Sequence, residues 1–418
     1  MSVAGDNTTA AVHVAARAEQ PLQERYAATR AQTEDLLRHL AAEDCALQSR
    51  PDTASLKWHL AHTTCFFETR VLQAVITGYL PFHPQFRRLF GGGQAQCGAL
   101  SRPSLDEVLA YRRHVNGRIA ALLDAGAPAA WPMVERGIQH EQRHQERMLA
   151  DLKHLFSQNP MQPVYAPAPP AVEAVPGLYQ WMAQPDGVHH IGHDGAGFCF
   201  DHEAPRHRVF LEAFEIALRP VTNAEYAAFI ADGGYARQEL WRAEGWEFKN
   251  AAGWQAPLYW QRDGASWLTF GLHGLCVPAA AAPVCHVSFF EAEAYARWAG
   301  ARLPREAEWE CFAAQQPVAG HFLEDGVFEP LPAGARAATQ IYGDVWEWTC
   351  SPCQPYPGYR PAAGAGGEDA GKFKSNQYVL RGGACVTPRS HLRASYRKPA
   401  AIDARRHFSG IRLARDLD

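Results

Sequence analysis

The sequence predicts an α+β protein of two domains, a four-helix bundle followed by a larger domain of short strands, short helices and loops. Up to residue 157, apolar residues recur at helical spacing between short turns. A proline-rich stretch follows, and proline disfavours helix interiors. Beyond it lie ten of the twelve tryptophans and many glycines. These observations predict a disordered N-terminus at 1–19, a metal-binding helical bundle at 20–157, a proline-rich linker at 158–177 and a second domain at 178–418.

Bulk composition limits the classes of partner. The 418 residues are 47% hydrophobic, and 40 Lys and Arg against 44 Asp and Glu give a formal net charge of -4. This balance creates no field that would attract nucleic acid or an anionic membrane. No run approaches the ~18 apolar residues of a membrane span, and the polar start lacks the apolar core of a signal peptide. We therefore expect a cytoplasmic protein with small-molecule partners.

Periodicity and capping signals place the helices. In the bundle, Ser104 followed three residues later by Glu107 is a capping box, which marks a helix start. The expected bundle helices run over Leu22–Ala42, Ser55–Thr77, Ser104–Leu123 and Met133–Ser157, and the second domain adds short ones over Asn223–Asp232, Ser288–Ala299 and Glu306–Ala314.

Two histidine motifs indicate a metal site inside the bundle. HEQRH places His140 and His144 four residues apart, on one helix face. It matches the HExxH pattern of zinc peptidases, but the third ligand that these enzymes carry shortly downstream is missing. The second expected helix carries WHLAH, from which His62 can complete a three-histidine site. Glu141 then has no peptidase role.

The same motifs carry a family resemblance. WHLAHTTCFFE and HEQRHQE, followed by PVCHVSFFEAEAYARW, ARLPREAEWE, YGDVWEWTCSPC and VLRGGACVTPRSHLRASYRK, resemble the ergothioneine-biosynthesis sulfoxide synthases of the EgtB type. That family joins a DinB-like bundle to a domain similar to formylglycine-generating enzymes, with a C-type-lectin-like α+β core. The resemblance covers nearly the whole chain.

The resemblance implies a chemistry. Three iron-binding histidines of the family correspond to His62, His140 and His144, with Fe(II) as cofactor and with hercynine, a chalcogen donor and O2 as substrates. His59 would be a helix-face residue and Glu68 a structural acceptor. The motifs GDVWEWT and RLPREAEWE are expected to build the core and to fix loops by buried ion pairs.

Departures from the ergothioneine enzymes bear on the donor. After Phe90 the chain continues as GGGQAQCGALS with no tyrosine, Arg143 replaces a glutamine, and Lys398 and Pro399 do not match the betaine pocket. We therefore expect the selenoneine synthase (SenA-like) branch, which joins hercynine to a selenosugar, ahead of a sulfoxide synthase that uses cysteine or γ-glutamylcysteine. The candidate substrate-binding residues are Arg143, Phe90, Arg397, Lys398, Asp403 and Arg405.

Other assignments stay open. Tyr396 is the candidate catalytic acid, with Tyr342 as a second possibility, and the oligomeric state is undetermined. A formylglycine-generating role would need paired cysteines near the end of the chain, where only Cys385 is present. Cys350 and Cys353 form a CxxC, which without a second pair is expected to be two incidental thiols. A non-catalytic lectin-like binding module is the alternative of another class.

Overall fold

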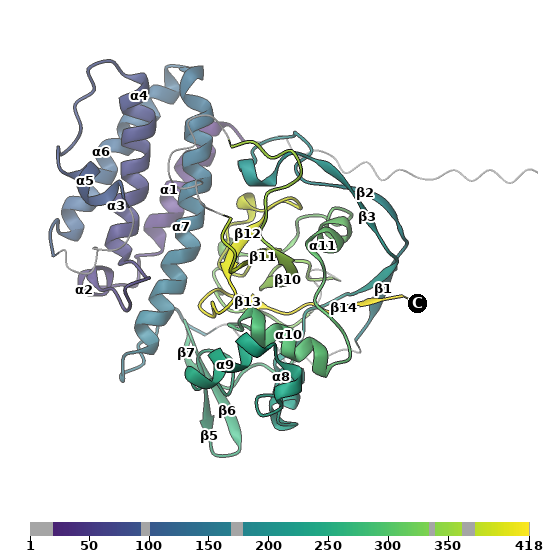
Figure 1. Cartoon of the computed structure of the whole chain (residues 1–418). Coiled ribbons are helices and arrows are strands. Elements are labelled where there is room, and N and C mark those ends of the chain that lie inside the picture. The colour runs from purple at the N-terminus through teal and green to yellow at the C-terminus, as the bar shows by residue number, and fades with distance from the viewer. Residues whose placement is uncertain (1–19, 93–100, 169–178, 334–338, 362–372, 418) are drawn as a thin grey trace, which may run out of the picture.

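The computed structural model describes residues 20–92, 101–168, 179–333, 339–361 and 373–417. Within them the chain forms a helical bundle and an α+β domain, the fold class that the sequence predicts (Figure 1). The expected disordered N-terminus, most of the loop after Gly92 and part of the linker lie outside the described residues. No helix in the described part is long and apolar enough to cross a membrane.

Four long helices build the bundle. Each packs apolar side chains into a shared core, in which Leu60, Val115 and Ile119 are fully buried. The predicted capping box at Ser104 and Glu107 is present. The long helices are α1 (Leu22–Asp35), α3 (Leu56–Phe67), α6 (Leu105–Asp124) and α7 (Trp131–Ser157); short helices α2 (Ala42–Ala46), α4 (Gln73–Val75), α5 (Phe86–Phe90) and η3 (Pro128–Ala130) connect them.

Two of the bundle helices differ from the prediction. The first ends at Asp35 rather than Ala42, because the chain turns after Leu36, whose carbonyl accepts a hydrogen bond from the Tyr165 hydroxyl. The second is interrupted by a π-helical turn, η1 (Glu68–Leu72). Glu68 within this turn is buried and accepts hydrogen bonds from the hydroxyls of Tyr79 and Tyr111, which is the structural role expected for it.

The second domain contains several small sheets. The central one has the order β12-β11-β10-β13, and three-stranded sheets β1-β4-β14 and β5-β6-β7 and the pairs β2-β3 and β8-β9 surround it. The strands are β1 (Trp181–Gln184), β2 (Gly187–Ile191), β3 (His207–Leu211), β4 (Phe214–Ala217), β5 (Trp260–Asp263), β6 (Ser266–Gly271), β7 (Gly274–Cys276), β8 (Gly320–His321), β9 (Tyr342–Gly343), β10 (Trp346–Pro352), β11 (Gln377–Arg381), β12 (Lys398–Ala401), β13 (Ser409–Gly410) and β14 (Ala414–Asp416).

Short helices pack around these sheets. The three predicted helices are present, and their ends lie within a residue of the expected ones. Helix α9 was not predicted, because its sequence shows little apolar periodicity. The helices are α8 (Asn223–Ala231), α9 (Ala243–Ala251), α10 (Phe289–Trp298) and α11 (Glu306–Ala313), with 3-10 turns η4 (Asp201–Glu203), η5 (Gln238–Leu240), η6 (Leu323–Asp325) and η7 (Arg389–His391).

The two signature motifs of the second domain are structural, as expected. Trp348 is fully buried, and Glu347 forms a buried ion pair with Arg412 at 2.6 Å. Glu306 is likewise buried between the guanidinium groups of Arg381 and Arg397. Trp346 differs from its neighbours in reaching the bundle, because its indole N–H donates to Glu146 on α7 at 3.1 Å.

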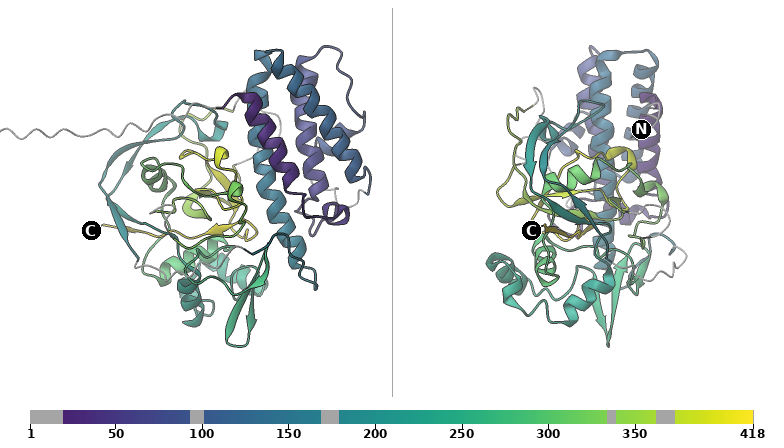
Figure 2. Two further views of the ribbon diagram at one scale, coloured as in Figure 1. Left: turned by 180° about the vertical axis from the view of Figure 1, so that it is seen from behind. Right: turned by 90° about the vertical axis from the view of Figure 1, so that its right-hand side faces the viewer.

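Helix α7 is a bundle helix that contacts the second domain, and Figure 1 and the left view of Figure 2 show the bundle and the second domain side by side. Besides Trp346, the second domain presents His391 to Gln139 at 2.8 Å and Glu329 to Lys153 at 2.9 Å. The segment after α7 also packs between the domains, since the backbone N–H of Tyr165 donates to the Leu272 carbonyl. One helix thus faces the histidine cluster and the second domain together.

Candidate metal centre and pocket

Three histidines converge inside the bundle. His62 comes from α3, and His140 and His144 come from consecutive turns of α7. Each offers a ligand atom, and these atoms all lie within 4.8 Å of one another. All three rings are buried, with Trp58 stacked on His62 at 4.3 Å between centroids and Phe66 stacked on His140 at 4.7 Å. The aromatic rings fix the planes of the imidazoles.

The orientation of His62 leaves its Nε2 for a metal. Its Nδ1 lies 2.5 Å from the carbonyl oxygen of Phe90, at the end of α5. A carbonyl only accepts, so Nδ1 carries the proton and Nε2 keeps its lone pair. Phe90 itself packs against Phe86 in the bundle core. The Phe90 carbonyl therefore orients His62, and the substrate contact expected for the Phe90 side chain stays a prediction.

His59 and His144 are in direct contact. His59 is fully buried, and its Nδ1 lies 2.7 Å from Nδ1 of His144. From the resemblance, His59 is expected to be a helix-face residue, and the structure adds this contact with His144. Burial, together with the nearby His140 and His62, holds the pKa of His144 well below its ordinary value. The ring is therefore neutral, as a metal ligand must be.

Glu141, the acid of the HExxH match, forms buried ion pairs with arginines of two other bundle helices. Its carboxylate contacts Arg30 and Arg112, each at 2.6 Å, and accepts a hydrogen bond from Thr33 at 2.5 Å. Burial acts to raise its pKa, but the two guanidinium groups outweigh burial and lower it to about 2. This carboxylate joins three helices and is not available as the general base of a peptidase.

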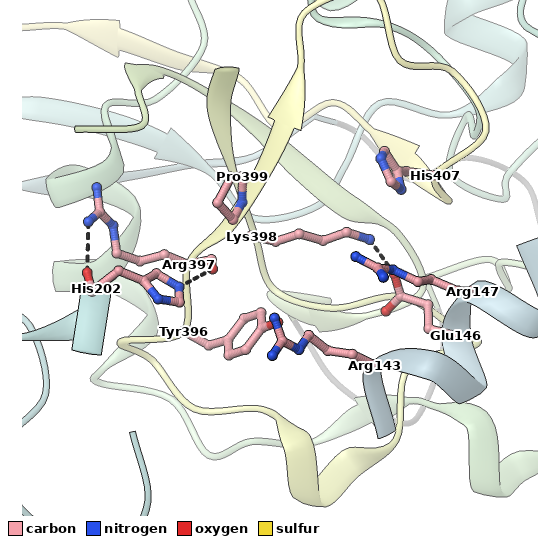
Figure 3. Close-up of a pocket in the computed structure, with 9 residues that line it drawn as sticks. All are labelled: Arg143, Glu146, Arg147, His202, Tyr396, Arg397, Lys398, Pro399 and His407. Carbon is pink, nitrogen blue, oxygen red and sulfur yellow. Dashed lines mark hydrogen bonds and ion pairs between the residues drawn. The ribbon is translucent and has the colours of Figure 1, made fainter. Parts of the chain in front are cut away.

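A charged pocket lies on the adjacent face of α7 (Figure 3). Arg143 and Arg147 each follow a site histidine by three residues, which rotates them by about 60° around the helix axis from His140 and His144. The cavity has a volume of about 90 Å³. Its lining residues are Arg143, Glu146 and Arg147 from α7, His202 from η4, and Tyr396, Arg397, Lys398, Pro399 and His407 from the second domain.

Lys398 and Glu146 connect the pocket walls. The Lys398 ammonium forms an ion pair with Glu146 and lies 4.6 Å from the Trp346 ring centroid. Burial lowers the pKa of Lys398, and the attraction of Glu146 opposes this effect. Thr387 donates to the other Glu146 oxygen at 2.6 Å. Glu146 on α7 therefore contacts three residues of the second domain at the pocket wall, Trp346, Thr387 and Lys398.

Both candidate acids are buried tyrosines, and only one reaches the pocket. Tyr396 lines it, facing Arg143 in Figure 3, and burial raises the pKa of its phenol to about 12. The hydroxyl stays protonated at neutral pH. Tyr342 lies elsewhere, in strand β9, where its hydroxyl donates to the Ala313 carbonyl at 3.1 Å.

Three predicted substrate-binding residues have different surroundings. The Arg397 guanidinium points away from the pocket and contacts Glu306 at 2.6 Å, so this residue lines the cavity without offering its charge. Arg405 pairs with Glu291 at 3.0 Å, because a buried carboxylate attracts the nearest guanidinium. Asp403 lies in the turn after β12 and does not line the pocket. The substrate contacts expected for these three residues therefore stay predictions, and the charges of both arginines are paired with buried glutamates.

Three lining residues were not predicted from the sequence: Glu146, Arg147 and His407. A signal for the first two was present, since HEQRHQER repeats a basic residue one helical turn after Arg143. His407 follows two arginines in a segment without periodicity. Only the fold brings that segment to α7.

Comparison with known proteins identifies the families of both domains. The sulfatase-modifying factor enzyme 1-like domain matches residues 173–327 and 326–417, and the DinB superfamily matches residues 25–192. The chain is 38% identical to a hercynine oxygenase of Mycolicibacterium thermoresistibile, over 67% of this chain and 68% of the relative. It is 37% identical to that of Mycobacterium tuberculosis, over 72% and 74% of the two chains. The chain belongs to the EgtB-type hercynine oxygenase superfamily.

Membership of the hercynine oxygenases makes this protein an iron-dependent oxidoreductase and removes the binding-module alternative. A formylglycine-generating enzyme of Streptomyces coelicolor is 30% identical over 54% of this chain and 85% of its own length. Cys385 is fully buried, and Cys350 and Cys353 are both free thiols.

Proposed function

We propose that this protein is a mononuclear non-heme iron enzyme that joins the imidazole ring of hercynine to a thiol, cysteine or γ-glutamylcysteine, with O2 as oxidant. The observation that carries the proposal is a cluster of three buried histidines beside a pocket lined by arginine and lysine side chains, in a member of the hercynine oxygenase superfamily. The overall change balances: a C–H and an S–H are lost, a C–S bond forms, one oxygen atom enters the sulfoxide and the other leaves as water.

His62, His140 and His144 would hold the iron. Three neutral imidazoles suit a divalent first-row metal and leave its charge uncompensated for anionic ligands. Bound there, iron supplies the redox chemistry with O2 that zinc lacks. The orientation of His62 by the Phe90 carbonyl fits this role, because it directs one nitrogen to the cluster before any ligand arrives.

The pocket residues bind and orient the organic substrates. Arg143 and Arg147 present guanidinium groups that match a carboxylate, which hercynine and both thiols carry. Lys398 is held by Glu146 at the same wall. Tyr396 keeps its proton, since burial raises its pKa to about 12, and it can donate a hydrogen bond into the pocket.

The donor is the point at which the proposal departs from the sequence-based expectation. The expected selenosugar depended partly on the loop after Phe90, of which residues 93–100 lie outside the described residues. The relatives are hercynine oxygenases, and none of the three supports a selenium donor. A cationic pocket also suits a carboxylated thiol better than a neutral sugar.

Anaerobic loading with Fe(II), followed by hercynine, O2 and one donor per reaction, tests the proposal. The donors are cysteine, γ-glutamylcysteine, a thiosugar and a selenosugar, and mass spectrometry identifies the product. We expect a hercynine sulfoxide with cysteine or γ-glutamylcysteine. Turnover with the selenosugar alone would refute the thiol assignment, and no hercynine-dependent O2 uptake with any donor would refute the reaction class.

A further inference from the structure

We propose that His59, Asp151 and Arg406 form a positioning relay through which the second domain fixes the metal-binding nitrogen of His144. The inference rests on the proposed iron site, and concerns residues to which neither the motifs nor the relatives give a role. None of the three is a proposed ligand. Each acts through the next one, in the order Arg406, Asp151, His59, His144.

The contacts form an unbroken chain behind His144. Nδ1 of His59 lies 2.7 Å from Nδ1 of His144, and Nε2 of His59 lies 3.2 Å from Oδ2 of Asp151. His59 is fully buried, and its carboxylate partner Asp151 is already paired with Arg406, so the ring is neutral. A neutral imidazole carries one N–H only, so each contact has a fixed direction.

The directions follow from Asp151. An aspartate oxygen accepts, so the single proton of His59 lies on Nε2 and points at Asp151. Nδ1 of His59 is then an acceptor, and His144 must donate to it from its own Nδ1. The lone pair of His144 therefore lies on Nε2. A carboxylate-histidine pair behind a ligand fixes the tautomer and increases the basicity of the metal-binding nitrogen.

The relay is completed from the other domain. Oδ1 of Asp151 is 3.0 Å from Arg406, which lies between strands β12 and β13, and Oδ2 also accepts the backbone N–H of Ala54 at 3.0 Å. Arg406 continues to Asp52 at the protein surface, at 2.7 Å. The side chain of Asp151 is thus held from both domains, and the affinity of the bundle for metal depends on the docking of the second domain.

The test measures Co(II) binding to the full-length metal-free protein, with no substrate present. Affinity is read by competition with a chelator, and the visible d–d spectrum reports the ligand field. His59→Leu removes the acceptor, whereas His59→Asn places an amide oxygen close to the position of Nδ1. Arg406→Met breaks the contact with the second domain. Arg50→Met is the control for Arg406→Met, because it removes the same charge. Arg50 contacts Asp52 at 3.0 Å on the exposed surface.

We expect His59→Leu to weaken Co(II) binding about ten- to a hundredfold and to alter the spectrum. His59→Asn should recover most of the affinity, Arg406→Met should lose it severalfold, and Arg50→Met should match the wild type. Wild-type affinity and spectrum in His59→Leu, or equal losses in the Leu and Asn variants, would overturn the relay. If the wild type binds Co(II) as expected but never converts hercynine, the proposed function fails and the relay stands.

Discussion

Replacing Glu141 by Gln separates the two interpretations of the HExxH match. In a peptidase, this change would remove the general base and leave the fold intact. Here the carboxylate is fully buried between Arg30 and Arg112, so its loss leaves two guanidinium groups without their shared counter-ion. We expect the variant to unfold more easily, by about 3–5 kcal/mol, as when one partner of a buried ion pair is removed.

The pKa of Glu141 gives an independent magnitude. Against the effect of burial, the arginines lower it from an ordinary 4.5 to about 2. At about 1.4 kcal/mol per pH unit, this corresponds to about 3 kcal/mol. Because the folded pKa is below the unfolded one, the contribution is complete above about pH 4.5 and disappears as the pH falls toward 2. Glu141→Gln should lack this acid-sensitive component.

Urea unfolding followed by circular dichroism measures both effects. The control is Glu135→Gln on the same helix, since Glu135 pairs with Arg25 where both side chains are partly exposed, 17% and 23%. A partly exposed ion pair of this kind contributes about 1 kcal/mol or less to the free energy of unfolding. Equal midpoints for Glu141→Gln and Glu135→Gln would refute the structural role of Glu141.

Three further predictions concern the core and the pocket. Gly137→Ala should destabilise the bundle by about 1–3 kcal/mol in the same unfolding assay, because an added Cβ would lie 2.3 Å from the buried ring of Phe67; an unchanged midpoint would contradict this. Arg143→Met should raise KM for hercynine or the thiol more than it lowers kcat, and unchanged steady-state kinetics would remove Arg143 from the pocket's function. Tyr396→Phe should lower kcat without shifting the pH-rate profile between pH 6 and about 9, since the pKa of Tyr396 is raised to about 12; loss of an ionisation in that range would contradict a permanently protonated phenol.

The bundle could be predicted from sequence because its information is local. Helical periodicity places α6 and α7 nearly to the residue, and spacing on α7 brings His140 and His144 to one face. His62 could be predicted as the third ligand, because a second helix carries histidines that can face the pair on α7. The interruption of the second helix at Glu68 was not predictable, because it depends on tyrosines distant in the sequence.

The pocket could not be predicted to the same degree. Its walls come from α7, from His202 and from a segment more than 200 residues after α7, and contacts such as that of Lys398 with Glu146 join them. The sequence does not show which acidic residue a given arginine or lysine will pair with. Arg397 and Arg405 were expected at the substrate, yet both neutralise buried glutamates of the second domain. The role of His59 was missed for the same reason, since Asp151 lies 92 residues away.

The iron content of the purified protein after anaerobic loading tests the central claim most directly. We predict one iron per chain for the wild type and its loss in His62→Ala. His154→Gln is the matched control, because His154 is a buried histidine of α7 that is not part of the cluster, and it should keep one iron. Retention of a full equivalent of iron by His62→Ala would contradict the three-histidine centre.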